Sequence, residues 1–279
     1  MIKRVYIEIT NICNLSCAFC AKNTRTPRMM NLQEFEHVIN QVAPLTKYIY
    51  LHVQGEPLMH PQIHEIMDIA AAHECHVQLV TNAAFLKDHM DLVNHPALRK
   101  ISFSLQSVEY QSTDPETFMK PILHCIERAS AAGHPFCELR FWRDDQMDLP
   151  KTKQCLDTLK QRYTFADSGR IRNQKILPGV YVDYSNPFEW PAENTEENSL
   201  SGTCLGALEQ IAVLSDGTVV PCCLDAEGKI SLGNLFSQTL SEILASERYT
   251  RMTEGFRNYR ITEELCRHCT FRRRFSNHK

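Results

Sequence analysis

The chain has 279 residues, 43% of them hydrophobic and 23% charged, and a mean hydropathy of −0.32, which is ordinary for a water-soluble globular protein. No apolar run approaches the roughly 18 residues of a membrane span, and a net charge of −3 argues against binding nucleic acid polymers over the whole surface. Twelve cysteines, with no signal-peptide pattern in the first residues, predict a reducing cytoplasm.

The first expected strand, at 5–9, leads into a loop that contains Cys13, Cys17 and Cys20. Thiolates ligate iron–sulfur clusters, and three cysteines in one loop can hold three irons of a cubane and leave the fourth open. A structural zinc site is the first alternative, but it would need a second pair of ligands nearby, and residues 21–50 offer only His37. A disulfide framework, the second alternative, is typical of short secreted chains.

After this loop, β-rich segments alternate with amphipathic helical segments to about residue 185, which predicts parallel βα units. The expected order is a helix capped by Asn31, a strand at 48–53, a helix at 61–73, strands at 76–80 and 100–105, a helix from Asp114 to Gly133, a strand at 136–142, a helix at 151–163 and a strand at 180–184. Six such units predict a partial (β/α)6 TIM-like barrel, in which function collects at the carboxyl ends of the strands.

Polar or unusual residues stand where three of these strands end. They are Gln54-Gly55-Glu56-Pro57 after the second strand, Thr81-Asn82 after the third, and Ser104 and Gln106 on one face of the fourth. A glycine lets the backbone approach a ligand, and a carboxylate can pair with an ammonium group. Taken separately, these segments also fit an ordinary turn and the polar face of a half-buried strand.

The fifth strand places Glu138 and Arg140 on one face, where unpaired burial would be costly. The two side chains therefore pair with each other or with neighbours, or they meet a ligand, and we favour Arg140 as a ligand contact. His52 shares a face of the second strand with Gln54 and could reach the same cavity, although a lone histidine is more often a satisfied core residue.

A loose segment at 186–201 precedes a change in character. A hairpin is expected at 210–222, with helices at 240–245 and 248–256. Four cysteines frame these elements, and the set predicts either a zinc site or a second cluster: Cys204, Cys222, Cys266 and Cys269. Cys223 adjoins Cys222, and because neighbours on a strand point oppositely only one of the two should bind. The arginine run at 272–274 is predicted to be exposed to solvent, as charge clusters near a terminus usually are.

The CxxxCxxC spacing, with Phe19 before the last cysteine, resembles the signature of the radical S-adenosylmethionine (radical SAM) superfamily. That resemblance implies that the open iron chelates SAM and that one electron splits it into methionine and a 5′-deoxyadenosyl radical. It implies SAM contacts for Gly55-Glu56-Pro57, which matches the family's GGEP motif except that Gln54 replaces the first glycine. It also implies such contacts for Thr81, Asn82, Ser104 and Gln106, and for Arg140 a contact with SAM or substrate.

The spacing of Cys204, Gly217 and Cys222 is similar to the SPASM/twitch extensions of this superfamily, with a layout close to twitch dehydrogenases of aminocyclitol biosynthesis. The resemblance implies a core barrel at 1–190 and a small hairpin-and-helix domain at 200–279. Four cysteines rather than seven, and few residues after Cys269, favour one auxiliary four-iron cluster. Its four thiolates would leave no iron free for substrate, which suits electron transfer, and the pattern favours Cys222 over Cys223.

The sequence thus predicts a cytoplasmic enzyme that uses SAM and two 4Fe-4S clusters to abstract hydrogen from a small molecule, as an oxidoreductase or lyase. A flavodoxin or ferredoxin-type donor would supply the electron. Open alternatives are a carbon–nitrogen lyase acting on a modified nucleotide, a peptide-modifying maturase, and a non-enzymatic iron–sulfur or zinc redox protein. The start of the chain at the first strand, with no peptide-recognition segment before it, counts against the maturase.

Overall fold

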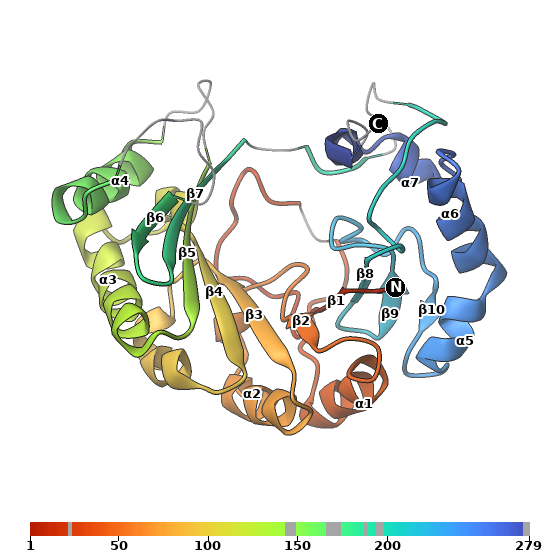
Figure 1. Cartoon of the computed structure of the whole chain (residues 1–279), viewed down its shortest axis with the longest axis horizontal. Coiled ribbons are helices and arrows are strands. Elements are labelled where there is room, and N and C mark those ends of the chain that lie inside the picture. Colours follow the sequence, from red (N-terminus) through yellow and green to blue (C-terminus); the bar gives the residue numbers. More distant parts are fainter. Residues whose placement is uncertain (22–23, 143–148, 166–173, 187–188, 193–197, 276–279) are drawn as a thin grey trace.

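A computed structural model describes the chain except residues 22–23, 143–148, 166–173, 187–188, 193–197 and 276–279. The strands within the described ranges form one sheet in the order β10-β9-β8-β1-β2-β3-β4-β5-β7-β6. The sheet curves into an open arc, and helices cover its outer side (Figure 1). This is the α/β partial barrel that the alternating pattern predicted, extended at both edges.

The barrel strands run parallel to one another, from β1 to β5 and on to β7. The strands are β1 (Arg4–Ile7), β2 (Tyr48–Tyr50), β3 (His76–Thr81), β4 (Leu98–Ser104), β5 (Phe136–Trp142), the antiparallel edge strand β6 (Gln174–Leu177) and β7 (Val180–Ser185). The helical segments are α1 (Leu32–Val42), η1 (Pro57–Met59), α2 (Ile63–Ala72), η2 (Leu86–Asn94), η3 (Leu105–Tyr110), α3 (Pro115–Ala132) and α4 (Pro150–Arg162).

Helix boundaries follow the capping signals in the sequence. The Asn31 side chain accepts a hydrogen bond from the Glu34 N–H, and the Glu34 carboxylate accepts one from the Asn31 N–H, so α1 begins with a capping box. Helix α3 begins after Asp114 and ends at Gly133, whose φ of 72° lies in the left-handed region. The predicted starts of both helices are therefore confirmed.

The C-terminal segment continues the barrel sheet. Strand β8 (Gln210–Val213) pairs parallel with β1, with Val5 opposite Ile211, and forms a hairpin with β9 (Thr218–Val220). The remaining elements are β10 (Gly233–Asn234), α5 (Leu240–Ala245), α6 (Glu247–Arg257), α7 (Glu264–Arg267) and η4 (Thr270–Phe275). Because β8 adds directly to β1, the segment predicted at 200–279 is hydrogen-bonded to the sheet rather than tethered by a linker alone.

Several predicted boundaries were wrong, and two of them bear on the site. Strand β2 ends at Tyr50, three residues early, because the following segment leaves the sheet: the Glu56 N–H donates to the Ile12 carbonyl, 2.9 Å away. Gln106 is not on the fourth strand, which ends at Ser104, but on η3. The two-residue alternation therefore applies at neither place. Among the described residues, no helix combines the length and apolar character that crossing a membrane requires.

Candidate functional site

A cavity of about 580 Å³ opens at the carboxyl ends of the barrel strands and extends to the C-terminal segment. Cys20 of the first cysteine group lines it, and so do Cys204, Cys222, Cys266 and Cys269 of the second. The rest of the lining comes mainly from barrel strands, from β8 and from the residues that follow β2 and β9. The cavity is therefore in contact with both cysteine groups.

The first cysteine group occupies the loop after β1. Cys13 and Cys20 are exposed and Cys17 is half-buried, and the Cys13 sulfur accepts the Leu15 N–H at 3.4 Å. Desolvation by the surrounding loop, then repulsion from the neighbouring cysteines, raises the pKa of Cys17 to about 12 and that of Cys20 to about 11. The sulfurs thus lie close enough to repel one another as thiolates, which a bound cationic cluster would relieve.

The donor set fits a cluster better than a single ion. Within the described ranges, no three His, Cys, Asp or Glu side chains stand close enough together to hold one metal ion. A cubane needs no such closeness, because each thiolate ligates a different iron. The loop contributes only thiolates, and the exposed sides of Cys13 and Cys20 leave room for a bulky group.

Aromatic rings fix the end of this loop. The Phe19 ring packs edge-on against Trp142 of β5, with centroids 4.4 Å apart, and against Tyr110 of η3 at 5.5 Å. Trp190 of the predicted linker donates its indole N–H to the Phe19 carbonyl at 2.9 Å. The backbone at Phe19 is therefore held from three elements, and with it the position of the adjacent Cys20.

The segment Gly55-Glu56-Pro57 packs against the backbone of the loop that carries the first cysteine group. Gly55 has φ of 77°, and a β-carbon there would lie 2.3 Å from the Thr10 carbonyl oxygen, so glycine is required. The Glu56 carboxylate accepts hydrogen bonds from Thr81 Oγ1 and the Asn82 N–H, both at 2.7 Å, and from the Leu58 N–H at 3.1 Å. It is buried and does not line the cavity, and its hydrogen bonds join the segment after β2 to the end of β3.

Replacing Glu56 by glutamine should destabilise the protein by about 1–3 kcal/mol, because the new amide NH₂ would face a buried N–H donor and leave it without an acceptor. Burial raises the pKa of Glu56 to about 7, partly offset by its three hydrogen bonds, so loss of charge is not the main cost. Urea denaturation at constant pH measures the loss. Glu36→Gln, on the exposed face of α1, is the matched control, and equal stability of the two variants would contradict the bracing role.

The other expected SAM contacts divide into two sets. Thr81 and Asn82 lie behind the cysteine loop: the Asn82 Nδ2 donates to the Asn14 side chain at 2.9 Å and lies 3.8 Å from the Cys13 sulfur. Ser104 and Gln106 line the cavity itself. Gln106 is only 2% exposed, and its Oε1 has no hydrogen-bond partner in the described structure. A buried acceptor without a donor is costly, so this position fits a bound polar ligand.

The neighbouring strand β5 carries a cation on the cavity wall. Glu138 is engaged by Lys100 Nζ at 2.7 Å and by the Ser102 hydroxyl at 2.8 Å. Arg140, two residues along β5, lines the cavity and makes no ion pair with any residue the structure describes. Of the alternatives left open by the sequence, Glu138 therefore pairs with neighbours, whereas Arg140 faces the cavity.

His52 lies on this wall, with its Nδ1 buried and without a partner among the described residues. Burial, and then the nearby Arg140 charge, lowers the pKa of His52 to about 3. The ring is therefore neutral at physiological pH, and its unprotonated nitrogen can accept a hydrogen bond there without adding positive charge.

The lowered pKa of His52 predicts a pH-dependent stability. The unfolded chain binds a proton near pH 6.5 and the folded chain does not, so this contribution is present above pH 6.5 and is lost as pH falls, by up to about 1.4 kcal/mol per pH unit. His52→Gln should flatten the decline between pH 7 and 5.5 in anaerobic urea titrations, while the exposed His124→Gln serves as the control for removing an imidazole. An unchanged slope in His52→Gln would contradict the buried neutral ring.

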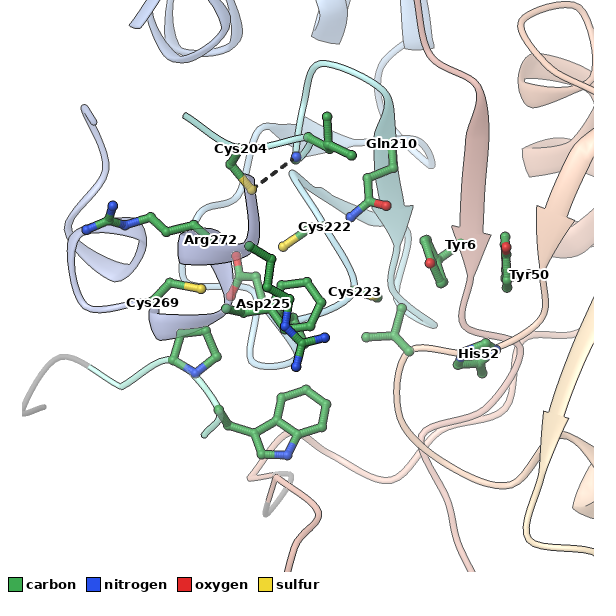
Figure 2. A pocket seen from close by; sticks show the side chains of 18 of the residues that line it. Tyr6, Tyr50, His52, Cys204, Gln210, Cys222, Cys223, Asp225, Cys269 and Arg272 are labelled. Carbon is green, nitrogen blue, oxygen red and sulfur yellow. Dashed lines mark hydrogen bonds between the residues drawn. The ribbon is translucent and has the colours of Figure 1, made fainter. Parts of the chain in front are cut away.

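The second cysteine group forms around β9 and α7. Figure 2 shows the sulfurs of Cys204, Cys222 and Cys269 around one space, and Cys266 lines the same part of the cavity. Burial and then the neighbouring cysteines raise the pKa of Cys222 and of Cys266, and the Cys204 sulfur accepts the Gly206 N–H at 3.3 Å. These four thiols therefore lie close together although Cys204 and Cys269 are far apart in the sequence.

Cys223 belongs to a different environment. Its side chain lies toward the barrel, on the side of Tyr6 and His52 (Figure 2). Burial raises the pKa of Cys223 to about 11, opposed by a hydrogen bond with Tyr6 and by the charges of Arg4 and Arg140. The two side chains therefore point in different directions, with Cys222 toward the other three cysteines, although β9 ends at Val220 and neither residue lies on that strand.

Two features near the site were missed by sequence reasoning. Glu8 is fully buried, where a carboxylate needs partners, and it joins Arg25 at 2.6 Å with the backbones of Gln54 and Ser215. A sequence signal was available, because Glu8 stands within a predicted buried strand, where a carboxylate is unexpected unless it has partners. Arg272 was wrongly read as solvated: it is 4% exposed and donates to the carbonyls of Cys266 and Ser201.

The fold and the two cysteine groups define a cysteine-rich α/β partial-barrel protein. Residues 7–140 match the family model of the radical SAM superfamily, and residues 204–270 match SPASM, an iron–sulfur cluster-binding domain. The chain belongs to the radical SAM superfamily and carries a C-terminal SPASM region. Membership implies an enzyme that uses SAM and a 4Fe-4S cluster, and the SPASM region implies further iron–sulfur binding.

Known relatives are distant. A GTP 3′,8-cyclase of Microcystis aeruginosa is 30% identical over 125 residues, which are 42% of this chain and 36% of that protein. An AdoMet-dependent heme synthase of Methanosarcina barkeri is 28% identical over 71% of this chain and 60% of that protein. The chain thus aligns with about a third of the length of the cyclases it matches. The crystal structure of BtrN in complex with AdoMet and 2-DOIA is similar in fold, with a TM-score of 0.55 at 14% identity over 97% of this chain and 93% of that one.

Proposed function

We propose that the protein cleaves SAM reductively at a 4Fe-4S cluster held by Cys13, Cys17 and Cys20. One electron delivered through this cluster would split SAM and yield the 5′-deoxyadenosyl radical that abstracts a hydrogen atom from a substrate. The observation that carries the proposal is that Cys20 lines the 580 Å³ cavity together with polar groups, His52 Nδ1 and Gln106 Oε1, that have no hydrogen-bond partner in the described part of the chain. A radical formed next to Cys20 would therefore lie beside a substrate that is bound in this cavity.

SAM would lie along the barrel side of the cavity. Gly55 and its neighbours bring backbone against the cysteine loop, and the buried Gln106 offers an acceptor that lacks a donor. The amino and hydroxyl groups of SAM are donors of the required kind. Asn82 and Thr81 would act by holding Asn14 and Glu56, and through them the loop.

We further propose that Cys204, Cys222, Cys266 and Cys269 hold one auxiliary 4Fe-4S cluster. Four thiolates occupy all four irons, so this cluster would transfer electrons without binding substrate. Because its four cysteines line the same cavity as Cys20, this cluster would suit the removal of an electron from a substrate radical. The donor would be a flavodoxin or ferredoxin-type protein of the cytoplasm.

The substrate is proposed to be a small polar molecule with an anionic group, oxidised at a carbon–hydrogen bond. Arg140 is a cation on the cavity wall without an ion pair in the described ranges, and the neutral His52 near it can accept a hydrogen bond from the substrate. Carbon–nitrogen cleavage of a nucleotide is the second candidate, supported by the Tyr6, Tyr50 and Trp142 rings on the same cavity and by the relatives named as GTP cyclases.

Anaerobic reconstitution followed by SAM and dithionite tests the proposal. The protein should form 5′-deoxyadenosine and methionine in equal amounts, and Cys20→Ala should abolish both while retaining the auxiliary iron. Full cluster content without either product would overturn the proposal. Candidate substrates deuterated at one carbon then identify the substrate class, because only the true substrate transfers deuterium into 5′-deoxyadenosine. Arg140→Gln should weaken its binding without altering SAM cleavage in its absence.

A further inference from the structure

Gln54 occupies the position where the family motif has its first glycine, and it contacts the first cysteine group. Its side-chain Oε1 lies 3.3 Å from the Cys20 sulfur. The residue is 6% exposed, and its Nε2 has no hydrogen-bond partner within the described residues. One end of the amide is therefore used and the other, a buried donor, is not.

The backbone of Gln54 holds this contact in place. Its N–H donates to the buried Glu8 carboxylate at 3.1 Å, and Glu8 is in turn paired with Arg25. The next residue, Gly55, packs against the backbone of the loop that carries the cysteines. The side chain thus cannot withdraw from Cys20 unless the packing of the loop changes.

The contact must change its direction when a cluster binds. A free Cys20 thiol can donate its proton to Oε1, but a thiolate ligand has no proton and only accepts. A half-turn of the terminal amide exchanges Oε1 and Nε2, which differ little in size. The buried NH₂ then faces the sulfur, so one rotation supplies both the missing partner of Nε2 and a donor to the ligand.

We propose that Gln54 donates an amide hydrogen bond to the Cys20 sulfur and raises the reduction potential of the first cluster. This inference rests on the proposed function only in taking Cys20 as a cluster ligand. Reduction adds negative charge to the cluster, so a donor to its sulfur stabilises the reduced state more than the oxidised state. Gln54 is then a positioning residue that eases the one-electron reduction on which SAM cleavage depends.

The test is a potentiometric titration of the reconstituted protein, followed by electron paramagnetic resonance. The signal that changes when SAM is added identifies the first cluster. Gln54→Leu keeps the size of the side chain and removes the donor, and should lower the ratio of reduced to oxidised cluster about tenfold at a fixed potential, equivalent to 59 mV for one electron. Gln54→Glu should lower the ratio as well, because it replaces the donor by an acceptor.

Gln174→Leu is the control, since it removes a half-buried amide on β6 that does not line the cavity. Its ratio should equal that of the wild type. A Gln54→Leu protein with full iron and the wild-type ratio would overturn the inference while wild-type SAM cleavage still supports the proposed function. If Gln54→Leu loses iron, Gln54→Glu and Gln54→Asn decide: an unchanged ratio in both overturns the inference. A wild-type protein without a SAM-responsive cluster would overturn both.

Discussion

Replacing Cys222 by alanine is expected to halve the iron of the reconstituted protein, from about eight to about four atoms per chain, whereas Cys223→Ala should retain about eight. The two residues are adjacent, both are half-buried, and both substitutions remove one sulfur. The pair therefore separates the loss of a ligand from the loss of packing better than distant cysteines would.

The expected difference follows from the two directions of the side chains. Cys222 lies with Cys204 and Cys269, whereas Cys223 lies toward Tyr6 and the barrel side of the cavity (Figure 2). A cluster cannot accept both neighbours as ligands unless the strand end is rebuilt. We therefore expect Cys223→Ala to alter the cavity and leave the auxiliary cluster in place.

Iron and acid-labile sulfide analysis, with zinc measured in the same samples, checks this result. Equal iron loss in both variants would contradict the assignment of Cys222, and loss in Cys223→Ala alone would reverse it. One zinc per chain that disappears in Cys222→Ala would show a structural zinc site, the alternative that the cysteine spacing left open.

The sequence predicted an element of this fold well where a capping or turn residue determines where that element begins or ends. The Asn31 and Asp114 caps set the starts of α1 and α3, and Gly133 sets the end of α3. The hairpin at 210–222 was also recognisable, because its turn residues lie between two apolar runs. Each of these features depends on residues within a few positions of one another.

Pairings across the chain could not be predicted in this way. Nothing local shows that β8 adds to β1, about 200 residues away, or that Arg272 turns inward to cap the Cys266 carbonyl. The same limit applied to Glu56: its motif indicated a ligand contact, which stays a prediction, and gave no sign of the Thr81 and Asn82 donors at the end of the next strand. Long-range hydrogen bonds decided these roles.

Glu8 is the residue where this limit has the largest consequence for stability. It is fully buried, and Arg25 donates to both of its carboxylate oxygens, at 2.6 and 2.8 Å. The backbone N–H groups of Gln54 and Ser215 donate to the same oxygens. One side chain thus connects β1, the cysteine loop, the end of β2 and the turn between β8 and β9.

Glu8→Ala should therefore lower the free energy of unfolding by about 3–5 kcal/mol, because it deprives a largely buried guanidinium and two backbone donors of their acceptor. Glu8→Gln should lose less, since one carbonyl oxygen remains. The matched control is Glu209→Ala, which breaks the exposed Lys3–Glu209 ion pair and should cost about 1 kcal/mol or less. Denaturant titrations of the iron-loaded proteins under nitrogen measure all three.

A double-variant cycle with Arg25→Gln separates the ion pair from the backbone contacts. If the pair carries most of the loss, Glu8→Gln combined with Arg25→Gln should be more stable than the sum of the single losses predicts, by about 1–3 kcal/mol. Strict additivity would place the effect in the two backbone N–H groups instead. A Glu8→Ala protein as stable as Glu209→Ala would contradict both explanations. The β1–β8 pairing would then be the main connection between β1 and the C-terminal segment.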